Sequence, residues 1–128
     1  MTEVKRAIET KAAPAADGAY SQGIQTGNFV FVAGQGPRDP LGGPLPNGVA
    51  AQTVRSLRNV EAVLQASGLD LTNVVKLTAH LADIEDFPIF DEACASVLPI
   101  PYPARTTVGS KLDGILVEID AIAASSIK

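Results

Sequence analysis

The middle of the chain reads Val74-Val75-Lys76-Leu77-Thr78-Ala79-His80-Leu81, in which apolar and polar residues alternate. A period of two is typical of a strand that is buried on one face. The pattern predicts a strand over 74–81. We expect its buried side to carry Val75, Leu77, Ala79 and Leu81, and its other side to carry Lys76, Thr78 and His80.

Helices are predicted on both sides of this strand. The first spans Val49–Ser67, where apolar residues recur at helical spacing until Gly68. The second spans Asp86–Leu98, with Pro88 in its first turn and further prolines that prevent its continuation. The expected buried residues are Ala50, Val54, Leu57, Val60 and Leu64 in the first helix, and Phe87, Phe90, Cys94 and Val97 in the second.

Shorter strands are predicted toward both ends of the chain. Their ranges are Val4–Ile8, Gly23–Thr26, Asn28–Gly34, Arg105–Val108 and Ile115–Ala123, of which the second and third form a hairpin. The segment 36–48 is rich in glycine and proline and must be a loop. The order β-β-β-α-β-α-β-β suggests an α+β fold with both helices on one sheet face. If the opposite face also carries apolar side chains, a homo-oligomer would cover it.

Composition limits the class of protein. The 128 residues, 46% hydrophobic, predict a single domain over 1–128. The net charge of -4 and the lack of a lysine or arginine cluster argue against nucleic acid as a partner. The single Cys94 can form no internal disulfide or zinc cluster, which fits a reducing compartment. No apolar run approaches the roughly 20 residues of a membrane span, and the polar start lacks a signal-peptide core. We therefore expect a soluble, cytoplasmic protein without a membrane partner.

Arg105 and Glu118 are the candidate site residues. Arg105 follows Pro103-Ala104, and its planar fork matches a carboxylate, although an ion pair at the surface or a subunit interface explains it equally well. Glu118 lies two residues from Asp120 on one side of a strand. Two like charges at this spacing could raise the pKa of one carboxyl into the range useful for acid/base catalysis. A solvated polar face of the strand is the commoner explanation of such a pair. Together they suggest an enzyme that holds a small carboxylate beside an acid/base group.

Other reactive side chains give weaker signals. Tyr20 lies between Gly18 and Gly23, where the backbone can approach a ligand, but a packed tyrosine in a turn explains it equally well. The only histidine, His80, is expected at the surface or an interface, and Cys94 is expected to be inert within the second helix. The glycines do not form a phosphate loop, so nucleotide binding is not supported.

Nearly the whole chain resembles the RidA (YjgF) family of small enamine/imine deaminases. No single segment is decisive, but their order in a chain of this length is a strong signal. The matching segments are Ala13-Pro14, Gly18-Ala19-Tyr20-Ser21-Gln22-Gly23, Val32-Ala33-Gly34-Gln35-Gly36-Pro37, Ala51-Gln52-Thr53 with Leu57 and Asn59-Val60, Ala66-Ser67-Gly68-Leu69, Val74-Val75-Lys76, Pro103-Ala104-Arg105 and Val117-Glu118-Ile119-Asp120-Ala121-Ile122-Ala123.

The resemblance implies a chorismate-mutase-like α+β fold with a mixed sheet, assembled as a homotrimer with clefts between subunits. It implies that Arg105 binds the substrate carboxylate and that Glu118 positions or activates water. Tyr20 and the backbone around Gly34 would line the same cleft. The implied reaction is hydrolysis of a 2-imino or 2-amino-enoic acid to a 2-keto acid and ammonia, without a metal or an organic cofactor.

Three residues depart from the family pattern. Thr107 stands where well-studied members carry a cysteine, Ala33 where they often carry a serine, and Asp91 where an asparagine is common. We expect Thr107 and Asp91 to line the substrate pocket. These differences leave two alternatives open: a pathway-specific relative acting on another unstable nitrogen compound, and a non-catalytic trimer that binds a keto acid as a regulator.

Overall fold

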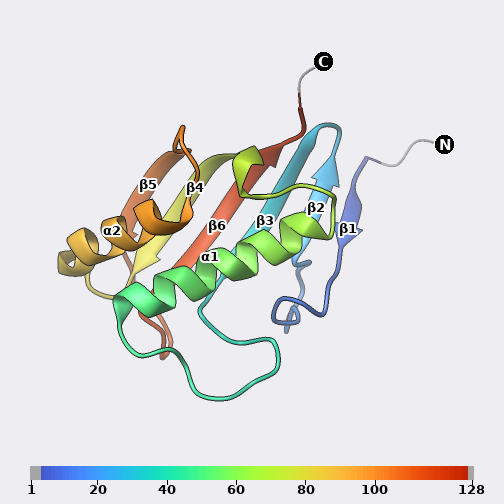
Figure 1. Cartoon of the computed structure of the whole chain (residues 1–128). Coiled ribbons are helices and arrows are strands. Elements are labelled where there is room, and N and C mark those ends of the chain that lie inside the picture. The colour runs from blue at the N-terminus through green and yellow to red at the C-terminus, as the bar shows by residue number, and fades with distance from the viewer. Residues whose placement is uncertain (1–3, 127–128) are drawn as a thin grey trace.

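The computed structural model describes residues 4–126 and consists of a six-stranded mixed sheet with two α-helices on one face (Figure 1). Short 3₁₀ helices precede β4 and α2, at Leu71–Asn73 and Ile84–Asp86. The predicted order of the helices and strands is confirmed, with ends that differ by one or two residues. The elements are β1 (Arg6–Ile8), β2 (Gly23–Thr26), β3 (Phe29–Gln35), α1 (Val49–Gln65), β4 (Val74–Leu81), α2 (Phe87–Val97), β5 (Ala104–Gly109) and β6 (Val117–Ala124).

The order of strands in the sheet differs from their order in the chain. The sheet runs β1-β2-β3-β6-β4-β5, so the last strand is inserted between β3 and β4. Only β4 and β5 pair in parallel, because α2 crosses over between them. Strands β5 and β6 are consecutive in the chain but are separated by β4, which determines where the side chains of Arg105 and Glu118 lie.

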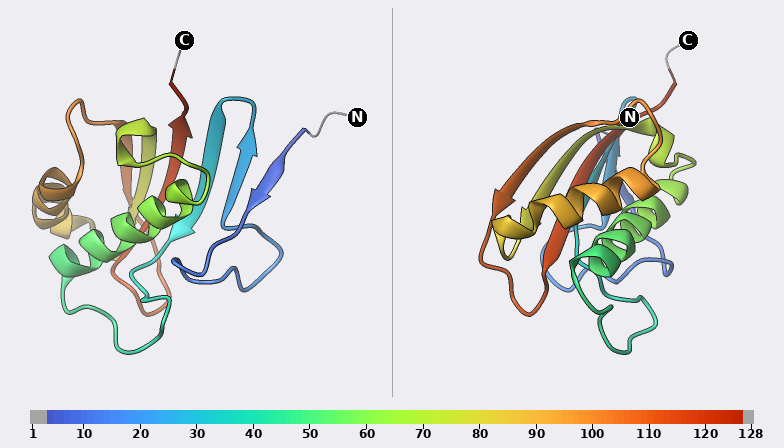
Figure 2. Two further views of the ribbon diagram at one scale, coloured as in Figure 1. Left: turned by 45° about the vertical axis from the view of Figure 1, so that its right-hand side comes forward. Right: turned by 60° about the vertical axis from the view of Figure 1, so that its left-hand side comes forward.

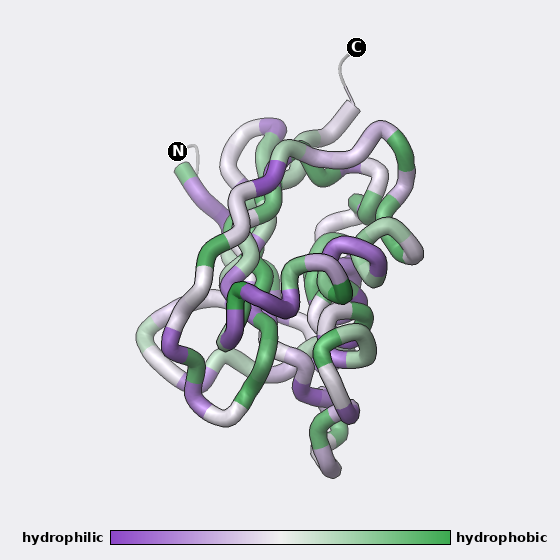
Figure 3. The backbone as a smooth tube through the Cα atoms, turned by 90° about the vertical axis from the view of Figure 1, so that its left-hand side faces the viewer, coloured by the Kyte–Doolittle hydropathy of each residue, from purple (hydrophilic) through white to green (hydrophobic). Residues whose placement is uncertain are grey.

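Both helices cover the same face of the sheet, as the two views of Figure 2 show. Helix α1 packs against β3, β6 and α2. Along the backbone, hydrophobic residues alternate with hydrophilic ones rather than forming one long apolar segment (Figure 3). Burial of apolar area between the two layers provides the main stabilisation. The fully buried side chains of this hydrophobic core include Leu57, Val60, Val63 and Leu64 of α1, Phe90 of α2, and Leu77, Leu81, Val117 and Ile119 of the sheet.

Strand β4 follows the predicted alternation except at its start. Leu77, Ala79 and Leu81 are fully buried, as predicted, but Val75 is 47% exposed and Val74 is buried instead. The reason is a register shift between Val74 and Lys76 where β4 pairs with β6. Such an irregularity changes the face on which the preceding residues point. The prediction for Val75 was therefore wrong.

Helix α1 buries a different set of residues from the predicted one. Leu57, Val60 and Leu64 are buried as expected, but Ala50 is exposed and Val54 is only partly buried. The remaining buried positions include polar residues, Gln52, Thr53, Ser56 and Asn59. In α2, Phe90 and Cys94 are buried, and Phe87 and Val97 pack partly buried against the core. In the described part of the chain, neither helix is long and apolar enough to cross a membrane.

The sheet face opposite the helices combines apolar and polar side chains. Phe29, Phe31 and Val108 are exposed on it, and the centre carries Thr78 and His80. The open face thus carries exposed apolar side chains, which was the condition given above for expecting a homo-oligomer.

Candidate functional site

Arg105 is held by residues of α2. It pairs with the buried Leu77 of β4, so its side chain points toward the helix-covered face. Its guanidinium carbon lies 5.2 Å from the ring centroid of Phe87 and 5.4 Å from that of Phe90. Its Nη1 donates a 2.8 Å hydrogen bond to Oδ1 of Asp91. Phe90 and Asp91 follow Phe87 by three and four positions, so the three side chains lie on the same part of the helix and together surround the guanidinium.

A cavity of about 250 Å³ lies beside this cradle. Its volume and its mainly apolar walls suit a small carboxylic acid with a short side chain. Burial raises the pKa of the Cys94 thiol to about 11, although Arg105 acts in the opposite direction. The thiol is therefore protonated at neutral pH and is a poor nucleophile, which agrees with the expected inertness of Cys94. The cavity is lined by Leu77, Asp91, Cys94, Ala95, Leu98, Tyr102, Pro103 and Arg105.

Glu118 lies on the open face of the sheet. It alternates with the fully buried Val117 and Ile119 of β6 and pairs with His80 of β4. Its carboxylate lies over Gly34 of β3, where an added Cβ would be 2.7 Å from Oε2 of Glu118. A side chain at position 34 would therefore force the Glu118 carboxylate to move away.

Tyr20, Gly34 and Glu118 line one cavity of about 490 Å³. Tyr20 is half exposed, and its hydroxyl donates a 3.0 Å hydrogen bond to Oδ1 of Asp17, which lines the same cavity. The cavity also contains the cationic side chains of Arg38 and Lys111. The structure thus brings together three of the residues that the family resemblance implies for one cleft.

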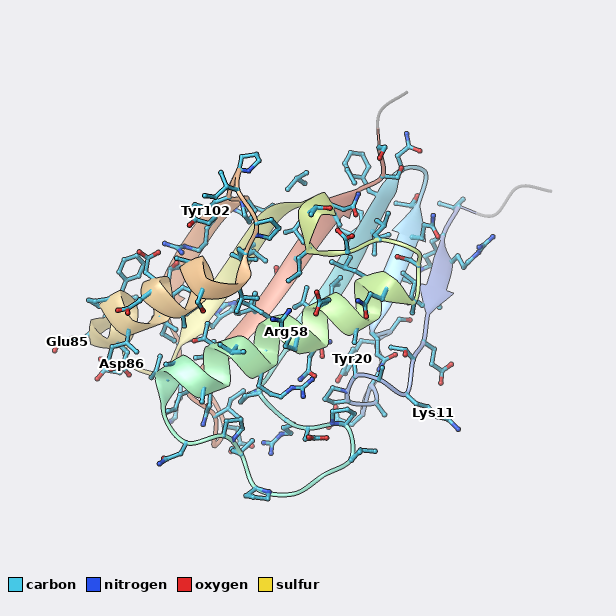
Figure 4. All side chains as sticks on the ribbon, viewed as in Figure 1. Lys11, Tyr20, Arg58, Glu85, Asp86 and Tyr102 are labelled. Atoms are coloured by element: carbon cyan, nitrogen blue, oxygen red, sulfur yellow. The ribbon has the colours of Figure 1, made fainter. Side chains whose placement is uncertain are left out.

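Arg105 and Glu118 do not meet within one chain. They lie on opposite faces of the sheet, and β4 separates their strands. Figure 4 labels Tyr102, which lines the first cavity, and Tyr20, which lines the second, in separate parts of the molecule. Although β5 and β6 are consecutive in the chain, they are not neighbours in the sheet, because β6 pairs between β3 and β4 rather than beside β5.

The other two candidate residues lie near Arg105. Asp91 lines the first cavity and is bonded to the guanidinium. Thr107 lies two residues along β5, on the same face as Arg105, and pairs with Ala79 of β4. It is partly buried and is not among the residues that line the first cavity.

Asp120 and His80 form a polar group on the open face, outside both cavities. Burial raises the pKa of the Asp120 carboxyl, whereas His80, Thr78 and Lys76 act to lower it. The main cause of this shift is burial rather than the neighbouring carboxylate that the sequence suggested. Nδ1 of His80 lies 2.7 Å from Oγ of Ser110, and the ring lines neither cavity.

Buried amides shape the loops around the second cavity, a role that was not predicted from the sequence. Nε2 of Gln22 donates to the carbonyls of Thr10, Ala13 and Pro14, and Oε1 accepts from the backbone N–H of Thr10. Gln22 is almost fully buried, so it fixes the loop that runs past Tyr20.

Helix α1 contributes two more amides of this kind. Nδ2 of Asn59 donates to the carbonyls of Gly36 at 2.9 Å and Arg38 at 2.8 Å. Oε1 of Gln52 accepts from the backbone N–H of Leu116, just before β6. The signal was visible in the sequence, since Gln52 and Asn59 are seven residues apart and therefore lie on the same helical face. Within residues 4–126, no group of three or more His, Cys, Asp and Glu side chains could hold a metal ion.

Comparisons with known proteins agree with this architecture. The model of the family Endoribonuclease L-PSP matches residues 10–125. A 2-iminobutanoate/2-iminopropanoate deaminase from Rattus norvegicus is 42% identical over 123 residues, which cover 94% of this chain and 90% of the relative. The crystal structure of RidA from the Antarctic bacterium Psychrobacter sp. superposes with a TM-score of 0.89 at 37% identity, covering 94% of this chain and 99% of that one. The structure of E. coli TdcF with bound serine gives a TM-score of 0.87 at 35% identity, with the same coverage.

Proposed function

The chain belongs to the endoribonuclease L-PSP family, which includes RidA and YjgF, and on this premise we propose that it hydrolyses reactive 2-imino and 2-amino-enoic acids to 2-keto acids and ammonia. The observation that carries the proposal is the Arg105 guanidinium, which α2 holds beside a small, mainly apolar cavity. The names of two relatives support it, because the rat protein is a deaminase of 2-imino acids and TdcF was crystallised with serine. Each of these compounds is a small carboxylic acid with nitrogen on carbon 2.

The proposed mechanism divides the work between two side chains. The substrate carboxylate accepts hydrogen bonds from Arg105, which fixes the position of carbon 2. Glu118 accepts a proton from water as the water oxygen bonds to carbon 2 of the imine. Glu118 returns this proton to the nitrogen of the resulting carbinolamine, and the C–N bond then breaks to release ammonia. The carbinolamine hydroxyl becomes the carbonyl of the keto acid as its proton passes back to Glu118. The mechanism uses no metal and no organic cofactor.

Because Arg105 and Glu118 lie on opposite faces, we propose that the active site forms between chains of a homotrimer. Arg105 of one subunit would face Glu118, Tyr20 and Gly34 of the next across a cleft. The exposed apolar side chains of the open face support association of this kind, since an apolar surface is stabilised when a second copy covers it.

The family name refers to an endoribonuclease, but the charge of this chain favours a small-molecule substrate. The net charge is -4, and the sequence has no cluster of lysine and arginine residues. Binding to an RNA backbone depends on such clusters, because they neutralise phosphates and release counterions. We therefore propose no nucleic acid partner.

Competition for the imine tests the proposal. An amino-acid oxidase generates 2-iminobutanoate in the presence of semicarbazide, and we expect the purified protein to suppress semicarbazone formation. Arg105→Ala and Glu118→Gln should each reduce this activity at least about 100-fold. The first change removes the group that binds the substrate carboxylate, and the second removes the group that accepts the proton from water. The matched control is Arg58→Ala, since Arg58 is an exposed arginine of α1 that bonds to Glu61 on the same helix.

Two results would contradict the deaminase proposal. One is semicarbazone formation that the protein does not change, and the other is equal suppression by Arg105→Ala. Saturable binding of 2-oxobutanoate without turnover of any imine would instead identify a regulatory keto-acid-binding protein. Binding of the keto acid with turnover of a different nitrogen compound would identify a pathway-specific relative.

A further inference from the structure

The guanidinium of Arg105 is already bonded to a carboxylate of its own chain. The Nη1–Oδ1 distance to Asp91 is 2.8 Å, and the two side chains are 24% and 54% exposed. Asp91 also lines the cavity in which we place the substrate. A substrate carboxylate that binds Arg105 therefore comes close to a second negative charge.

This arrangement limits how Arg105 can bind an acid. The guanidinium rests against the rings of Phe87 and Phe90, which hold it in place through cation–π contacts. One donor atom, Nη1, is used by Asp91. The remaining N–H groups can still hold a carboxylate, but the positive charge that attracts it is largely balanced by Asp91.

We propose that Asp91 is a specificity-determining residue that makes the cavity select the imino acid over its keto-acid product and over dicarboxylic acids. The inference rests on the proposed function. A protonated imino acid carries one negative and one positive charge, and its N–H can donate to a carboxylate oxygen of Asp91, whose side chain is half exposed. The keto acid has lost this nitrogen and is an anion, so Asp91 repels it. A dicarboxylic acid carries two carboxylates, and Asp91 repels both of them.

The selection has a consequence for turnover. Hydrolysis of the zwitterion by one water gives the keto-acid anion and an ammonium ion, so the reaction itself removes the group that Asp91 favours. The product then binds less tightly than it would to Arg105 alone. Asp91 thus weakens the binding of carboxylates to Arg105, and as a result the product leaves more easily and dicarboxylic acids are excluded.

Calorimetric titration with 2-oxobutanoate and 2-oxoglutarate tests the inference. The wild-type protein is compared with the variants Asp91→Asn, Glu92→Gln and Arg105→Ala. Asp91→Asn keeps an oxygen that can accept from Arg105 but removes the charge. Glu92→Gln removes the same charge from the neighbouring residue of α2, which lines a groove between the helices rather than the cavity. We expect Asp91→Asn to bind 2-oxobutanoate about fivefold more tightly and 2-oxoglutarate about twentyfold more tightly, and Glu92→Gln to change neither by more than about twofold.

Steady-state kinetics give a second readout that a purely structural role would not move. In Asp91→Asn, we expect the inhibition constant of 2-oxobutanoate to fall about fivefold while kcat/KM for 2-iminobutanoate does not rise. Unchanged or weaker keto-acid binding in Asp91→Asn would overturn the inference, as would an equal gain in Glu92→Gln. Keto-acid binding that survives Arg105→Ala would instead contradict the proposed function, because Arg105 would then not be the carboxylate clamp.

Discussion

Asp120 and Glu118 lie on the same side of β6, and the burial of Asp120 has a consequence for stability. Burial raises the pKa of the Asp120 carboxyl above 3.8 in the folded state. A raised pKa means that the folded protein holds this proton more tightly than the unfolded chain does. The contribution of Asp120 to stability is therefore fully present below pH 3.8 and is lost as the pH rises through the folded pKa.

Asp120→Asn should therefore be more stable than wild type at pH 7. The amide keeps an oxygen that can accept from Thr78 and avoids the cost of ionising a partly buried carboxyl. We expect a gain of less than about 1 kcal/mol at pH 7, because the group is still partly solvated, and no gain near pH 3.5. Urea unfolding at a fixed protein concentration across this pH range measures the difference. A gain that does not depend on pH, or one shared by Glu92→Gln, would contradict the argument.

Individual residues also show where reasoning from the sequence reached its limit. The chemistry of Arg105 and Glu118 identified them as candidates, but it could not assign their faces. Strand β6 alternates strongly, so the orientation of Glu118 was predictable from Val117 and Ile119. Strand β5 lies at the sheet edge and has no buried residue, so its own sequence pattern does not reveal that Arg105 points toward α2.

At the scale of elements, α1 has two roles that its apolar pattern did not separate. Leu57, Val60 and Leu64 pack against the sheet, which the period of the sequence predicted. Gln52 and Asn59 lie on the same buried face and hold loops. A helical period predicts which residues point inward, but it does not reveal which polar ones have loop carbonyls to bond. The exposure of Val75 could not be predicted from β4 alone either, because the register shift that causes it depends on how β4 pairs with β6.

Asn59→Ala tests the loop-holding role of α1. The change leaves the carbonyls of Gly36 and Arg38 without their donor, and both residues line the cavity that contains Glu118. We expect the free energy of unfolding to fall by about 2 to 3 kcal/mol, from lost hydrogen bonds at a fully buried side chain. Amide exchange at Gly36, Arg38 and Asp39 should accelerate, and imine turnover should fall.

The neighbouring residue of the same helix supplies the control for this change. Arg58 bonds to Glu61 at the surface, so Arg58→Ala should cost less than about 1 kcal/mol and leave loop exchange unchanged. Equal losses of stability in the two variants, or unchanged amide exchange of this loop in Asn59→Ala, would show that Asn59 does not hold it.

At the scale of the whole molecule, the position of β6 explains why one chain is an incomplete site. The α+β class and the placement of both helices on one face followed from the order of elements in the sequence. The strand order did not, because several sheets are compatible with the same succession of elements. By entering between β3 and β4, β6 places Glu118 on the open face, while β5 keeps Arg105 under α2.

Subunit mixing tests whether the two halves of the site come from different chains. Arg105→Ala and Glu118→Gln are each inactive in the proposed mechanism. If equal amounts are unfolded together and refolded as random trimers, about a quarter of the clefts should pair an intact Arg105 with an intact Glu118. Imine turnover should therefore recover to about a quarter of the wild-type value. Adding Phe31→Glu to both variants places a charge on the open face and should abolish the recovery, whereas Ile89→Glu, on the exposed side of α2, should not. A mixture that stays as inactive as its components would show that each site lies within a single chain.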